Sequence, residues 1–81
     1  MNRAKGEMLG DLQRIVRSLT GRDDLVVNGD MTLLTDLELN SFELMDFAVA
    51  IEEEYGIEIP DNDIVGFRTV QNVQDYIAAH V

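Results

Sequence analysis

Apolar residues recur along much of the chain at the three- and four-residue spacing of an amphipathic helix. They predict a first helix over residues 3–19, ended by Thr20 and Gly21, because glycine readily takes the left-handed position that follows a helix. They also predict a last helix over residues 70–80, capped by Thr69. The expected core positions of these two helices are Met8, Leu9, Leu12, Ile15, Val16, Leu19, Val70, Val73, Tyr76 and Ile77.

A further helix is predicted in the middle of the chain, between Asn40 and Tyr55. Asn40 and Glu43 have the spacing of a capping box, and Gly56 ends the pattern. Residues 57–60 are expected to be extended, since the residue before a proline is kept out of the helical region. Asp61 then caps a predicted short helix over residues 62–65.

The segment between the first two helices is harder to interpret. Asn28-Gly29 is typical of a tight hairpin, but a hairpin without a third strand is marginal, and no other part of the chain has a strand pattern. We therefore expect residues 21–40 to form a long connection, held to the core by Leu25, Val27, Leu33, Leu34 and Leu37. The prediction is an all-α fold in one domain, residues 1–81: a bundle of three longer helices plus one short helix.

Charge narrows the choice of partners. The formal net charge is −10, and Arg68 is the only lysine or arginine that follows Arg22. Such an acidic surface repels nucleic acid and anionic lipid and attracts basic protein surfaces, although it also serves solubility alone. The chain has no cysteine, no N-terminal apolar stretch typical of a signal peptide and no apolar run long enough to span a membrane. We expect a cytoplasmic protein without membrane insertion.

The predicted middle helix has two apolar stripes, whereas the core of so small a domain uses only one. One stripe consists of Leu44, Phe47, Ala48, Ile51 and Tyr55. The other consists of Phe42, Met45 and Val49, rimmed by Asp46, Glu52 and Glu53. An apolar strip with a carboxylate rim is typical of a docking face, although burial against the long connection is an equal alternative.

Candidate chemistry is sparse. Ser41 lies in the first turn of the middle helix, where backbone N–H groups and the helix dipole favour a phosphate, but serine is also common there for local reasons. His80 has no partners for a catalytic triad. Residues 61–72 begin like a calcium loop, but Val65 and Asn72 stand where ligands belong, so no metal site is predicted. No catalytic residue is proposed, and the chain is not expected to be an enzyme.

Three motifs in order resemble those of acyl carrier proteins. They are DLELNSFE at residues 36–43, AIEEEYGIEIP at 50–60 and TVQNVQDYI at 69–77. The resemblance implies that Ser41 is the attachment point of 4′-phosphopantetheine, transferred from coenzyme A by a phosphopantetheinyl transferase. Acyl groups would then be held as thioesters on the cofactor's thiol, which agrees with the absence of cysteine.

The resemblance also implies roles for the two stripes. The stripe of Leu44, Phe47, Ala48, Ile51 and Tyr55 matches core positions of the family. Phe42, Met45, Asp46, Val49, Glu52 and Glu53 match partner-facing positions of the family. The implied partners are the transferase and the enzymes that load and use acyl groups in fatty acid, polyketide or related lipid biosynthesis, with basic docking patches. The carrier itself is expected to be a monomer.

Two residues depart from the family pattern. Asn40 replaces an aspartate, which keeps a helix cap but removes a carboxylate beside the phosphate. Phe42 replaces a leucine, as in some specialised carriers. A secondary pathway is therefore expected. The alternatives are an aminoacyl or D-alanyl carrier and an unmodified adaptor that binds partners through the acidic middle helix.

Overall fold

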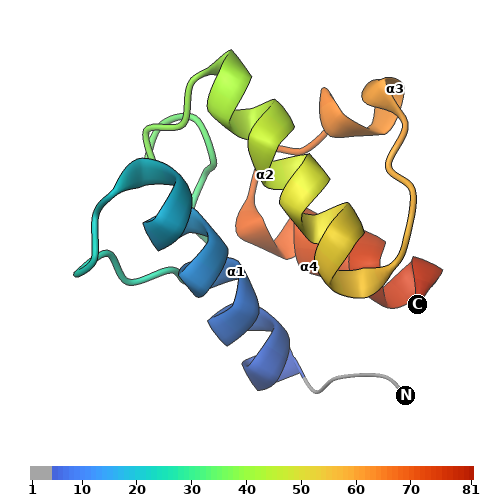
Figure 1. Ribbon diagram of the computed structural model, residues 1–81, viewed down its shortest axis with the longest axis horizontal. Coiled ribbons are helices and arrows are strands. Elements are labelled where there is room, and N and C mark those ends of the chain that lie inside the picture. The colour runs from blue at the N-terminus through green and yellow to red at the C-terminus, as the bar shows by residue number, and fades with distance from the viewer. Residues whose placement is uncertain (1–4) are drawn as a thin grey trace.

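The computed structural model describes residues 5–81, with side chains from Glu7 onward, and shows an all-α bundle (Figure 1). The helices are α1 (Lys5–Thr20), α2 (Ser41–Tyr55), α3 (Asp61–Ile64) and α4 (Val70–His80). Helix α2 packs against both α1 and α3, and α4 also contacts α1. The predicted order of three longer helices and one short helix is confirmed. The part of the first predicted helix over residues 3 and 4 lies outside the described residues.

The core is apolar and draws on every helix and on the long connection. Fully enclosed side chains include Leu12, Val16, Leu33, Leu37, Phe47, Ile51, Val70, Val73 and Ile77. Leu9, Leu19 and Tyr76, which were predicted to face inward, are only partly buried at the edge of this core. The shared core fixes how α2 is held and which of its side chains are exposed.

Helix ends follow local chemistry closely. Gly21 and Gly56 adopt φ angles of 73° and 67° after α1 and α2, as predicted for glycine at these positions. Thr69 caps α4 through a reciprocal pair of bonds with Asn72. The predicted cap of α3 is wrong: Asp61 is the first helical residue, and Pro60 occupies the cap position without a side-chain hydrogen bond. Proline suits that position because a cap residue is extended, and Pro60 has φ −60° and ψ 150°.

The long connection, residues 21–40, is a series of turns rather than a hairpin. Its one bridge of strand type joins Thr32 to Thr69. Gly29 has a structural reason other than a hairpin turn, because a Cβ there would lie 3.1 Å from Gln71 Oε1 and 3.2 Å from Gln74 Oε1. The Asn28-Gly29 signal therefore reflects close packing of the connection against α4.

Polar bonds tie the connection to α1. Arg17 Nε donates to the Leu25 carbonyl at 2.7 Å, and the Val27 N–H donates to Gln13 Oε1 at 3.0 Å. Among the apolar side chains expected to anchor the segment, Val27, Leu33 and Leu37 are buried and Leu25 is half-buried, with Leu39 as an additional buried anchor. The prediction for Leu34 is wrong: its side chain is 59% exposed, because the turn at residues 33–37 directs Leu33 and Leu37 to the core instead.

Candidate functional site

The start of α2 is built by a complete capping box. Asn40 Oδ1 accepts a hydrogen bond from the Glu43 N–H at 2.8 Å, and Glu43 Oε1 accepts one from the Asn40 N–H at 3.0 Å. The box satisfies two backbone donors that would otherwise lack partners at a helix start. It leaves the N–H groups of Ser41 and Phe42 outside these bonds.

Ser41 is the first helical residue and is exposed. Its position combines an accessible hydroxyl with the positive end of the α2 dipole. A phosphate joined to that oxygen would lie beside backbone N–H groups, where negative charge is stabilised. The arrangement can therefore accept and hold a phosphodiester.

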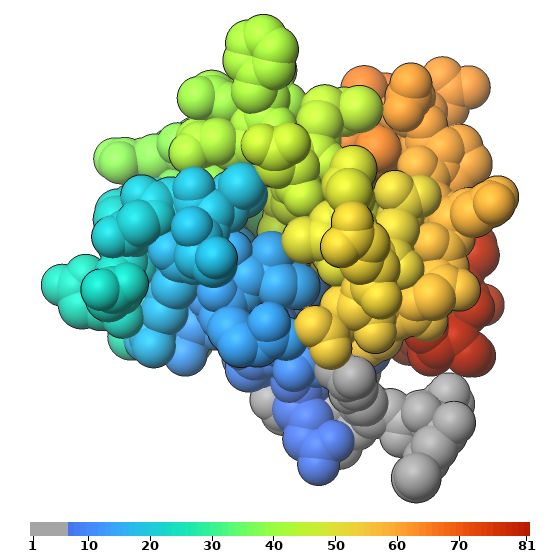
Figure 2. Space-filling model, viewed as in Figure 1, coloured from blue at the N-terminus to red at the C-terminus, as the bar shows by residue number. Residues whose placement is uncertain are grey.

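The apolar face of α2 that was a docking candidate is exposed. The side chains of Phe42, Met45 and Val49 are 83%, 39% and 47% exposed, respectively, whereas Phe47, Ala48 and Ile51 on the opposite side are buried. We call the first three residues the α2 face. Figure 2 shows the outer surface of α2, green to yellow, running between the blue α1 and the orange α3. All three side chains thus lie outside the core, and Phe42 is the most exposed of them.

The three candidate rim carboxylates differ from one another. Asp46 and Glu53 are exposed beside the α2 face. Glu52 is half-buried, and its Oε2 accepts a hydrogen bond from the Ile59 N–H at 2.9 Å. Glu52 thus anchors the extended link after α2, and its carboxylate has a structural role whether or not a partner also contacts it.

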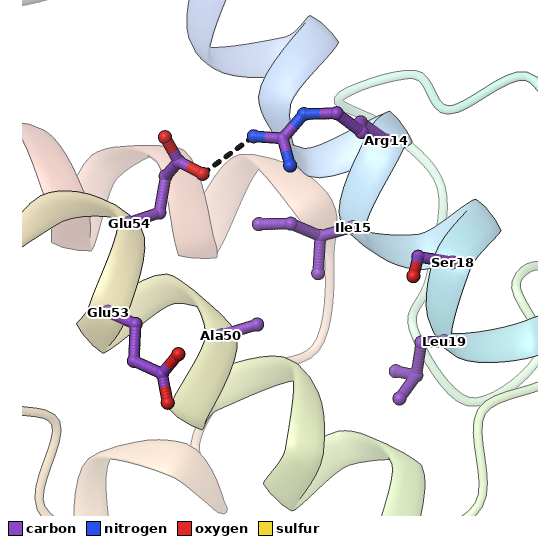
Figure 3. Close-up of a pocket in the computed structure, with 7 residues that line it drawn as sticks. All are labelled: Arg14, Ile15, Ser18, Leu19, Ala50, Glu53 and Glu54. Carbon is purple, nitrogen blue, oxygen red and sulfur yellow. Dashed lines mark hydrogen bonds and ion pairs between the residues drawn. The ribbon is translucent and has the colours of Figure 1, made fainter.

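A shallow groove lies between α1 and α2 (Figure 3). Arg14 crosses it to Glu54, with Nη2 2.6 Å from Oε1. Ile15, Leu19 and Ala50 supply its apolar wall, and Ser18 and Glu53 lie at its edges. The Arg14–Glu54 ion pair lies at one end of this open groove.

The remaining polar candidates have structural surroundings. The His80 ring stacks on Tyr76 with centroids 4.0 Å apart, and the Tyr76 hydroxyl donates to Asp63 Oδ2 at 2.8 Å. The pKa of Tyr76 is raised above its usual 10.0 by desolvation and then by the hydrogen bond to Asp63. In the described part of the chain, no cluster of three or more histidine or carboxylate side chains could hold a metal ion. Similarly, none of the helices over residues 5–81 combines the length and apolarity needed to cross a bilayer.

Sequence reasoning missed one feature beside Ser41. Glu38 has a φ of 56°, the only positive value at a residue other than glycine in the described chain, and Arg22 contacts it. The sequence signal was weak, because nothing in the pattern of residues 36–39 marks Glu38 as left-handed.

Comparison with known proteins agrees with this geometry. Residues 10–77 match the family model described as a phosphopantetheine attachment site. The chain is similar to an acyl carrier protein of Rhodococcus erythropolis, at 34% identity over 77 residues that cover 95% of this chain and 85% of that protein. It is also similar to a meromycolate extension acyl carrier protein of Mycolicibacterium aurum, at 34% identity over 77 residues covering 95% and 79%. Among solved structures, an acyl carrier protein of Thermotoga maritima superposes with a TM-score of 0.81 at 22% identity, covering 91% of this chain and 86% of that one, which shows a shared fold.

Proposed function

The chain belongs to the acyl carrier protein family, and it matches the family model for phosphopantetheine attachment. We propose that Ser41 is the residue to which the 4′-phosphopantetheine arm is attached. The observation that carries this proposal is the exposed hydroxyl of Ser41 at the first position of a capped helix. The other serine of the chain, Ser18, lies inside α1, away from a helix start. Only Ser41 therefore offers both an accessible oxygen and a helix N-terminus for the phosphate.

The residues at the start of α2 fit such a group. The Ser41 oxygen would attack the pantetheine-linked phosphorus of coenzyme A, and its proton would pass to a base on the transferase. The pyrophosphate P–O bond of coenzyme A would break, and adenosine 3′,5′-bisphosphate would leave. The helix dipole would stabilise the remaining negative charge, and Asn40 would hold the helix start without adding a competing negative charge. When bound, the cofactor supplies a thiol on a flexible arm, on which acyl groups are held as thioesters.

We propose that partner enzymes dock on the α2 face together with Asp46 and Glu53, and that Glu52 supports this surface from its edge. Phe42, Met45 and Val49 would supply apolar contact, and the carboxylates would attract basic side chains. The net charge of −10 favours basic partners and opposes nucleic acid. A carrier has to leave each enzyme, so these interfaces should be small and sensitive to salt.

The setting is proposed from the same features. The partners are the phosphopantetheinyl transferase and the enzymes that load and use acyl chains in lipid biosynthesis, including pathways such as the one named for the meromycolate relative. We propose that the protein acts in the cytoplasm as a monomer, because a dimer formed through the α2 face would cover the surface that partners need.

The test is transfer of an acylated arm. The purified protein, Ser41→Ala and Ser18→Ala would each be incubated with acyl-coenzyme A and a broad-specificity transferase, and then treated with neutral hydroxylamine. We expect one acyl-phosphopantetheine on the parent and on Ser18→Ala, with the acyl group released by hydroxylamine as a thioester should be. Ser41→Ala should gain nothing.

Absence of the adduct on the parent and on Asn40→Asp, while a known carrier is modified beside them, would contradict the proposal. An adaptor that is never modified would then be favoured. Loss of the adduct in Ser18→Ala instead of Ser41→Ala would place the arm on Ser18 in α1, and it would also contradict the proposal.

A further inference from the structure

The segment that leads into α2 contains a residue in an unfavourable backbone conformation. Glu38, three positions before Ser41, has a φ of 56°, a left-handed value that residues with a Cβ seldom adopt. The two residues on either side are fixed by the core: Leu37 and Leu39 are both buried. The left-handed backbone of Glu38 therefore sets the direction of the chain between two anchored side chains, and so the direction in which Asn40 and Ser41 leave the connection.

A single guanidinium brackets this residue. Arg22, directly after the glycine that ends α1, donates from Nη2 to the Leu37 carbonyl. Its Nη1 also lies 3.7 Å from Glu38 Oε2. The Leu37 carbonyl and the Glu38 nitrogen belong to the same planar peptide group. The hydrogen bond from Arg22 holds this group in place and so restrains the φ angle of Glu38, which is the rotation about its N–Cα bond.

The bracket connects to Ser41 through the backbone. The Leu39 N–H donates to the Leu33 carbonyl at 3.1 Å, and the Leu37 N–H donates to the Thr32 carbonyl at 3.0 Å. Asn40, next along, makes the capping box. If Glu38 relaxed to a right-handed conformation, Leu39 could not stay buried while Asn40 kept its place at the start of α2.

From these contacts we infer that Arg22 is a positioning residue for the modification of Ser41: it holds Glu38 left-handed, so that the helix start is presented in a form the transferase can bind. This inference rests on the proposed function of Ser41. Arg22 and Glu38 act together: glycine would adopt a positive φ at position 38 without help, whereas glutamate needs the contact with Arg22 to stay left-handed. The bond to the Leu37 carbonyl is the main contact, since an exposed ion pair at 3.7 Å contributes little.

The inference predicts a particular kinetic pattern for Arg22→Met. When only a fraction of the protein is in the form that binds, the apparent affinity falls by that fraction while turnover of the bound form is unchanged. We expect the KM of the transferase for the carrier to rise about fivefold with kcat unaltered. Arg14→Met removes the same charge from α1 and breaks an exposed ion pair, so it serves as the matched control and should leave KM unchanged.

The double variant Arg22→Met/Glu38→Gly is the decisive arm. Glycine takes a positive φ without the cost that Glu38 bears, so the double variant should recover a KM within about twofold of the parent. Ile77→Val, a buried change in α4 that lowers stability without altering Arg22 or Glu38, should leave KM at the parent value while the protein remains helical. An unchanged KM in Arg22→Met, or an equal rise in the single and double variants, would overturn the inference.

Amide hydrogen exchange separates this inference from the proposal on Ser41. In Arg22→Met, exchange at the Leu39 N–H should become about tenfold faster, and in Arg14→Met it should not change. If the parent is never modified, the proposed function fails, and the exchange rates alone decide whether Arg22 holds the segment. Equal Leu39 exchange in the parent and Arg22→Met would overturn the inference even where Ser41 is modified.

Discussion

Asn40 and Glu43 bond reciprocally, side chain to backbone, across the first turn of α2, and Ser41 lies between them. The pair fixes where the helix begins, and so it makes Ser41 the first helical residue. Replacing an N-cap asparagine with alanine costs about 1 kcal/mol, whereas aspartate is an equivalent cap. We expect Asn40→Ala to lower the melting temperature by about 4–8 °C and Asn40→Asp to leave it nearly unchanged.

Thermal unfolding followed by circular dichroism measures both variants. Equal melting of the parent and Asn40→Ala would show that the capping box does not contribute to stability. The two variants, Asn40→Ala and Asn40→Asp, also separate helix capping from recognition by the transferase, because only Asn40→Asp places a carboxylate beside Ser41.

Leu33 and Leu34 are neighbours in sequence with opposite surroundings. Leu33 is fully buried, whereas Leu34 is 59% exposed. Truncating a buried leucine removes its contacts and leaves a cavity, so Leu33→Ala should cost about 2–5 kcal/mol. Leu34→Ala should change the free energy of unfolding by no more than about 0.5 kcal/mol. Urea unfolding measures both values, and similar midpoints for the two variants would contradict the arrangement of the connection.

Crowded carboxylates are expected to destabilise the fold at low salt. Raising the salt concentration from about 0.01 to 0.1 M shortens the Debye length from about 30 to 10 Å and screens this repulsion. The melting temperature should therefore rise with sodium chloride, and further with magnesium or calcium chloride at equal ionic strength. Asp46→Asn/Glu53→Gln, which lowers the negative charge on α2, should melt higher at low salt and respond less. Melting that does not respond to salt would rule out repulsion as a significant term.

Ionisation of the Tyr76 hydroxyl is expected to destabilise the folded protein at alkaline pH. Desolvation and the bond to Asp63 raise its pKa above the usual 10.0, so the folded state favours the neutral phenol. The resulting stabilisation is complete below pH 10 and is lost as the pH rises through the raised pKa of the folded protein. The melting temperature of the parent should fall more steeply above pH 10 than that of Tyr76→Phe, which has no ionisable group there. Parallel curves would contradict the contribution of this hydroxyl.

The helices were predictable from sequence because their signals are local. The apolar spacing in α1 and α4, the glycines at positions 21 and 56 and the cap at Asn40 each depend on neighbours a few residues away. The long connection was not predictable in the same way. Leu33 and Leu34 are the same type of residue with nearly the same neighbours in sequence. Only the turn between Thr32 and Leu37 determines which of them is buried.

The candidate site likewise contains some features with a local sequence pattern and others that depend on contacts between distant residues. The exposure of Phe42, Met45 and Val49 could be predicted because these residues share the helical spacing of the core stripe but are offset from it around α2. The bond from Ile59 to Glu52 and the bracket of Arg22 around Glu38 join residues that are distant in sequence or conformationally unusual. Neither leaves a pattern in the sequence, so both required the structure.

The attachment of phosphopantetheine to Ser41 is the central claim, and intact mass measures it most directly. The parent, Ser41→Ala and Ser18→Ala would be incubated with coenzyme A, magnesium and a broad-specificity phosphopantetheinyl transferase, with a known carrier modified in parallel. A gain of one phosphopantetheine on the parent and Ser18→Ala, with none on Ser41→Ala, is the result we predict. An unmodified parent beside a fully modified known carrier, with Asn40→Asp equally unmodified, would contradict it.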